Sequence, residues 1–108
     1  MSLKFNIKRG DTSPAIEFAL LPSDISLGGA TVRFQMRLRN AQTVIDEPAV
    51  ILGEDPPVVA YLWQPNDTET SGIYQAEFRV QYFDGAIETF PNAGFIEVAI
   101  NEDVEGLT

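Results

Sequence analysis

Two stretches of strict polar–apolar alternation constrain the fold of this chain more than any other feature of its sequence. From Thr31 to Arg39 every second residue is apolar, and the residues between are polar or cationic. The same period of two runs from Ile73 to Phe83 and ends at the turn pair Asp84-Gly85. Side chains of a strand point alternately to its two faces, whereas a helix needs apolar residues three and four positions apart. Both stretches are therefore predicted to be half-buried antiparallel strands.

Shorter β-rich stretches fill most of the remaining sequence, with turn residues between them at intervals of roughly 8–12 residues. They are Leu3 to Lys8, Ala15 to Leu21, Thr43 to Leu52, Val58 to Trp63, Ala86 to Phe90 and Phe95 to Ile100. The third is interrupted by Asp46-Glu47-Pro48 and is expected to be an edge strand or a bulged strand. Asp67 or Thr68 could cap one helical turn between Asn66 and Ser71. The pattern predicts an all-β sandwich of two antiparallel sheets with seven to eight strands.

Length and composition bound the number of domains and the available chemistry. The chain has 108 residues, of which 1–101 are expected to form one domain and 102–108 an acidic, frayed tail or linker. The sequence contains no cysteine and no histidine, so it lacks disulfides, thiolate chemistry and imidazole groups. We therefore expect no cofactor, no metal site, no catalytic residues and no enzymatic activity.

The acidic balance of the sequence bears on its partners. Sixteen carboxylates against seven lysines and arginines give a net charge of −9. Such a surface repels the phosphate backbone, so no nucleic-acid binding is expected. No apolar run approaches the ~20 residues of a membrane-spanning helix, so no membrane insertion is expected either.

The start of the second alternating stretch favours one kind of sandwich. In immunoglobulin-like domains, a tyrosine near the start of the penultimate strand bonds through its hydroxyl to upstream backbone, which forms the tyrosine corner. Gly72, Tyr74 and Ala76 have the spacing of that corner, and Ala76 stands where antibody domains have a cysteine. The alternative is that Tyr74 is an ordinary strand aromatic. Trp63 and Phe34 are candidates for the large buried aromatics of this immunoglobulin-like core.

Four residues are candidates for a docking patch. Arg33, Arg37 and Arg39 share one face of the first alternating stretch, and the aromatic Phe83 falls on the polar side of the second. The arginines could meet an acidic partner or a second copy of the chain. They could instead pair across strands with Glu77 and other carboxylates.

The other aromatic residues have two interpretations. Exposed on one surface, Tyr61, Trp63, Phe83 and Phe95 could line a sugar-binding face. The alternation instead places Tyr61 and Trp63 on the inward side of their strand and Phe83 on the polar side of its own. Phe95 is likewise expected to be a core residue.

The order of several motifs along the chain carries a family resemblance. They are Lys8-Arg9-Gly10-Asp11-Thr12-Ser13-Pro14, Leu27 to Phe34, Val59 to Trp63, Asp67-Thr68 with Gly72 to Phe78, and Phe83-Asp84-Gly85 with Thr89-Phe90-Pro91. From about Phe5 to Ile100, the chain resembles the N-terminal immunoglobulin-like domain of phage baseplate upper proteins and related tailed-phage tail proteins. The resemblance implies a structural component of a phage or prophage tail.

That resemblance also implies partners and a location. A domain of this family would dock onto other tail or baseplate proteins during virion assembly in the bacterial cytoplasm, and could form a homo-oligomer. The alternative is a carbohydrate-binding or spacer module of a secreted bacterial surface protein.

Overall fold

The computed structural model describes residues 3–20, 25–39 and 42–104, and within these ranges all regular structure is β. The strands are β1 (Leu3–Lys8), β2 (Ile16–Ala19), β3 (Thr31–Leu38), β4 (Thr43–Pro48), β5 (Val50–Glu54), β6 (Pro57–Tyr61), β7 (Gly72–Gln81), β8 (Ile87–Phe90) and β9 (Ile96–Asn101). The stretch from Asn66 to Ser71, where one helical turn could be capped, contains turns and bends instead. No helix long and apolar enough to cross a membrane occurs in the described residues.

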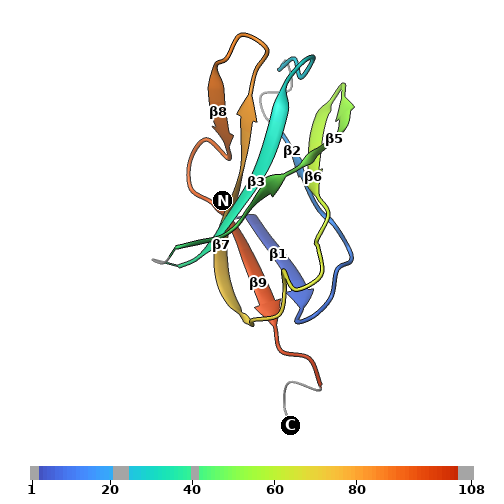
Figure 1. The fold of residues 1–108 in the computed structure, drawn as a ribbon, viewed down its shortest axis with the longest axis vertical. Coiled ribbons are helices and arrows are strands. Elements are labelled where there is room, and N and C mark those ends of the chain that lie inside the picture. Colours follow the sequence, from blue (N-terminus) through green and yellow to red (C-terminus); the bar gives the residue numbers. More distant parts are fainter. Residues whose placement is uncertain (1–2, 21–24, 40–41, 105–108) are drawn as a thin grey trace.

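The strands form two sheets that pack face to face (Figure 1). The larger sheet has the order β1-β9-β7-β3-β4, with β8 also paired to β7, and the smaller sheet has the order β2-β6-β5. β1 runs parallel to β9, and every other described pair is antiparallel. The predicted all-β, immunoglobulin-like sandwich is therefore confirmed.

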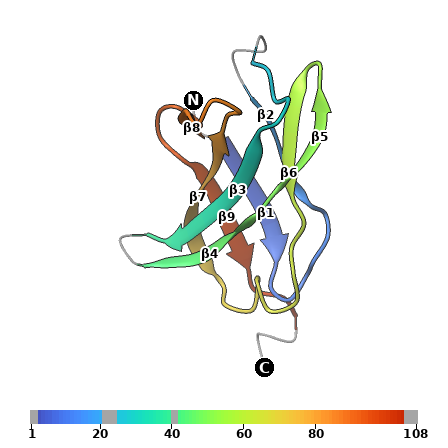
Figure 2. The same cartoon turned by 45° about the horizontal axis from the view of Figure 1, so that its top comes forward.

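The structure has one strand more than the upper expected number because the stretch from Thr43 to Leu52 forms two strands. β4 pairs with β3 in the larger sheet, and β5 pairs with β6 in the smaller sheet. Between them the amide of Ala49 donates a hydrogen bond of 2.8 Å to the carbonyl of Val32. Figure 2 shows this continuous stretch of chain passing from one sheet to the other.

The core lies between the two sheets and follows from the alternation. In the register of β3 with β7, Phe34 lies opposite Phe78 and Val32 lies opposite Val80, and all four side chains are buried. The residues between them in each strand face outward, away from the smaller sheet. One face of each long strand thus supplies the core, while the other face is left for solvent or partners.

The domain continues to the end of β9 and slightly beyond. Glu102 accepts a hydrogen bond of 2.6 Å from Ser71 Oγ, and Asp103 is 3.1 Å from Arg9 Nη2. The first two residues of the predicted tail therefore contact the sandwich. Residues 105–108 lie outside the described residues, so the frayed tail stays a prediction.

Candidate functional site

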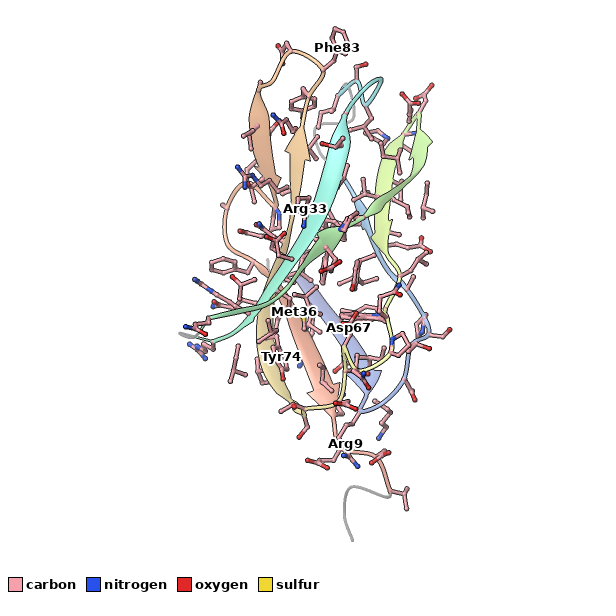
Figure 3. The ribbon with its side chains drawn as sticks, viewed as in Figure 1. Arg9, Arg33, Met36, Asp67, Tyr74 and Phe83 are labelled. Carbon is pink, nitrogen blue, oxygen red and sulfur yellow. The ribbon has the colours of Figure 1, made fainter. Side chains whose placement is uncertain are left out.

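The tyrosine corner lies at the start of β7, where Figure 3 labels Tyr74. Tyr74 is buried, and its Oη donates a hydrogen bond of 2.7 Å to the carbonyl of Thr70. Gly72 has φ +153°, and a Cβ at this position would lie 3.5 Å from the Tyr74 ring. Ala76 is fully buried two residues further along β7. These contacts hold the turn against the strand, which is a structural role.

Phe34 and Trp63 meet in the core together with Tyr61. The Phe34 ring stacks on the Tyr61 ring with 4.5 Å between centroids, and Trp63 lies edge-on to both. The Tyr61 hydroxyl donates a 2.6 Å hydrogen bond to Asp67 Oδ2, which also accepts the Gln64 amide at 2.8 Å. Phe34 belongs to the larger sheet and Tyr61 to the smaller, so the cluster joins the layers. Tyr61 and Trp63 are core residues, as predicted, and offer no aromatic platform to a sugar.

The three arginines lie on the outer face of the larger sheet. Arg33 Nε donates to Asp46 Oδ1 at 2.8 Å, and Arg37 Nε donates to Gln75 Oε1 at 3.1 Å. Glu77, the cross-strand partner considered from the sequence, lies opposite Gln35. Arg33 thus makes the expected cross-strand pair with a carboxylate, that of Asp46, while Arg37 bonds to Gln75 and not to Glu77. The hydrogen bond from Arg33 lowers the pKa of the Asp46 carboxyl below its ordinary value.

Phe83 lies apart from the arginines. It is 86% exposed at the tip of the β7–β8 hairpin, at one end of the molecule, whereas Arg33 lies near the middle of its sheet (Figure 3). Its ring covers the backbone of Gly29, because a Cβ on Gly29 would come within 2.8 Å of Phe83 Cδ2. The structure therefore does not bring the four predicted docking residues into one patch.

The assignment of Phe95 to the core is wrong. Phe95 is 39% exposed, and the guanidinium of Arg37 lies 5.2 Å from the centre of its ring. The inward side chains of β9 are Ile96, Val98 and Ile100, so the residue just before the strand points to the opposite face.

The smaller sheet has an apolar outer face that was not predicted from the sequence. In the strand register, Ala60 lies beside Glu17 of β2 and Val50 of β5, and its side chain points away from the core. Val58 lies beside Ala19 of β2 and points to the same side. Leu62 follows Tyr61 with the opposite orientation and is 53% exposed. We call Ala19, Val50, Val58, Ala60 and Leu62 the outer β6 face. The available signal was the run Val58 to Trp63, which is apolar at every position.

The outer β6 face is hollowed on one side and rimmed by negative charge. Val50 and Leu62 line a hollow of ≈ 310 Å³ together with Glu47 and Pro48. Further carboxylates stand nearby: Glu17 in β2, and Glu54 and Asp55 at the turn from β5 into β6. None of the lysines and arginines among residues 3–20, 25–39 and 42–104 belongs to β2, β5 or β6.

The titratable groups with shifted pKa values do not form a reactive cluster. Burial, aided by Glu88, raises the pKa of Tyr82 to about 12. Burial likewise raises the pKa of Tyr61, with Asp67 adding to the effect, and that of Tyr74. In the described part of the chain, no three His, Cys, Asp or Glu residues gather as metal ligands would.

The sheet order and the tyrosine corner define the class of this protein as an immunoglobulin-like β-sandwich. No family model matches the chain, and no curated protein matches it either. Among solved structures, it is similar to CopC from Methylosinus trichosporium OB3b, with a TM-score of 0.55 and 16% sequence identity. The match covers 94% of this chain and 86% of CopC. At this identity the likeness shows the shared fold.

The predicted role as a phage tail or baseplate component is wrong on this comparison. The chain matches CopC over 94% of its length, and nothing in that match points to a tail protein. The motifs behind the prediction are turn and strand elements that sandwiches of unrelated function share. These motifs indicate the fold and are not specific to virion proteins. The resemblance of the sequence to the baseplate family is not itself tested by the match.

Proposed function

We propose that this domain is a non-catalytic protein-interaction module and that the outer β6 face is its contact surface. The observation that carries the proposal is the two-sided apolar character of β6. A strand in a two-layer sandwich normally has one apolar face and one polar face. Strands that read apolar throughout are typically covered on both sides. In this domain the inner side of β6 is covered by the core, whereas no strand among the described residues covers its outer side.

The shape of the outer β6 face suits a protein partner. Leu62 and Val50 are large, exposed apolar side chains beside the small, buried Ala60, so the surface has relief as well as apolar area. Contiguous apolar patches rimmed by polar residues mark interaction sites. An apolar centre within a charged rim is the usual anatomy of a protein interface.

The chemistry of the side chains supports a non-catalytic role. A general acid or base works best with a pKa near the working pH. The pKa values that shift in this domain move away from neutrality, because Asp46 moves down while Tyr61, Tyr74 and Tyr82 move up. A soft-metal site is not part of the proposal, since the sequence has no Cys or His and Met36 is buried in the core.

Site-specific photocrosslinking tests the proposal. A photoreactive amino acid replaces Leu62 in the full chain, in the organism that encodes it, and in a matched variant it replaces Val104, an exposed apolar residue beyond the end of β9. We expect a discrete protein adduct from position 62 and none from position 104. Adducts of equal yield from both positions, or no adduct from position 62, would contradict the proposal.

A further inference from the structure

The outer face of the larger sheet has the opposite charge to the rest of the molecule. The register places Lys4, Lys8, Arg33, Arg37 and Arg79 on this face, and Arg39 lines a hollow there with Ile73 and Phe95. The carboxylates on the same face are Asp46, Glu77 and Glu97. Six cations against three carboxylates give a net charge of +3, which leaves −12 for the rest of a chain with net charge −9.

This cationic face also has an apolar centre. Ile73 and Phe95 are both exposed and line the same hollow of ≈ 220 Å³. Arg37 lies over the Phe95 ring, while Arg39 and Arg79 make no hydrogen bond or ion pair with any described residue. Their guanidinium groups are therefore available to carboxylates from outside the chain.

We infer that the outer β6 face binds the cationic outer face of the larger sheet of a second copy, so that the domains associate head to tail. The inference rests on the proposed function and names its partner. Each face has an apolar centre. The rim of the outer β6 face carries Glu17, Glu47, Glu54 and Asp55. The cationic face offers Arg39 and Arg79, while its Lys4 is paired with Glu97 at 3.5 Å. Complementary charges of this kind guide and orient association.

The alternative symmetric pairing places like charges together. Two outer β6 faces packed against each other would bring two carboxylate rims into contact, and like-charge contacts across an interface cost several kcal/mol. A contact between two different faces leaves one unoccupied face of each kind at the two ends of the pair. Further copies can bind there, so the assembly continues into a ring or an open chain.

The molecule measures 50 × 25 × 24 Å. Its broadest side, 50 by 25 Å or about 1,250 Å², is an upper bound for either face and has room for the ~800 Å² per partner of a standard interface.

Sedimentation velocity of the full chain tests the inference, from about 10 µM to about 1 mM. We expect the average mass to rise with concentration. Because the rims are exposed, raising the salt from about 50 mM to about 500 mM should weaken association by about tenfold. A wild-type chain that stays at 11.9 kDa throughout at low salt overturns the inference.

Two variants, each altered on one face, test the head-to-tail geometry. Leu62→Asp damages only the outer β6 face, and Arg39→Glu with Arg79→Glu reverses charge only on the cationic face. Each variant alone is expected to be monomeric, with Val104→Asp as the control that still associates. Mixing the two damaged variants should restore a dimer, because each keeps the face that the other has lost.

Each remaining outcome has a defined meaning. A mixture that stays monomeric while each variant is folded by circular dichroism overturns the head-to-tail contact, and so does a variant that associates normally. The photocrosslinking experiment separates this inference from the proposed function. An adduct at twice the mass of the chain supports both, whereas an adduct with a different protein supports the interaction module and overturns self-association.

Discussion

At the scale of single residues, the start of β7 depends on a hydroxyl and on a missing side chain. Tyr74 donates to the Thr70 carbonyl, and Gly72 lies between them with a positive φ that residues with a Cβ adopt only with strain. In antibody domains an inter-sheet disulfide stabilises this region, and here the position of its cysteine is held by Ala76. The corner must therefore stabilise the crossing without covalent help.

Tyr74→Phe is expected to lower the free energy of unfolding by about 1–2 kcal/mol, because the part-buried Thr70 carbonyl loses its donor. Urea unfolding followed by circular dichroism measures the loss. Tyr82→Phe is the matched control. Glu88 accepts the Tyr82 hydroxyl and keeps its hydrogen bond from Asn92 after the change, so a smaller loss in the free energy of unfolding is expected. Equal losses in the two variants would show that Tyr74 acts only as a strand aromatic.

For some single residues, the sequence was sufficient to predict whether the side chain is buried or exposed. Alternation alone placed Phe34 and Trp63 inside and Phe83 outside. The same alternation, carried back one position from Ile96, would have placed Phe95 outside. The error came from treating an aromatic residue as core material before fixing the register of its strand.

At the scale of elements, the long strands could be predicted and the crossing between sheets could not. β3 and β7 differ from their predicted bounds by at most two residues, because one periodic face of each is fully covered by the core. The stretch holding β4 and β5 has no such local signature, since its change of sheet depends on the edges that β3 and β6 offer. The outer β6 face was missed for a related reason: apolar residues at every position do not reveal which side stays uncovered.

Ala49→Pro tests the crossing, because it removes the amide that bonds the Val32 carbonyl between β4 and β5. We expect a loss of about 1–3 kcal/mol in the free energy of unfolding. Ala49→Gly keeps the amide and should cost about 0.5–1 kcal/mol through chain entropy alone. Urea midpoints that are the same for the two variants would mean that this hydrogen bond does not hold the crossing.

At the scale of the whole molecule, the three tyrosines make stability sensitive to alkaline pH. Each has a pKa raised by burial, and that of Tyr82 reaches about 12. A raised pKa in the folded state means that the unfolded chain loses its proton first, at its ordinary pKa of about 10. The stabilisation is therefore complete below about pH 10, and the part due to Tyr82 is lost as the pH rises through about 12. Tyr61 and Tyr74 contribute in the same direction.

We expect the free energy of unfolding, measured from urea midpoints, to fall between about pH 10 and pH 12, with a slope of up to about 1.4 kcal/mol per pH unit for each tyrosine. Tyr61→Phe should make the decline shallower, because it removes one of the three groups whose ionisation favours unfolding. A midpoint that is constant over this range would contradict the assignment of buried, neutral hydroxyls.

The aromatic cluster between the sheets also provides an intrinsic optical probe. Trp63 is the one tryptophan of the sequence and is buried among Phe5, Phe34 and Tyr61, where the two layers meet. Its fluorescence therefore comes from a single, water-poor environment, and separation of the layers moves the emission to longer wavelength. Spectral change during unfolding reports the opening of the sandwich, while far-ultraviolet circular dichroism reports the strands. If the two transitions coincide, the layers and their strands are lost together.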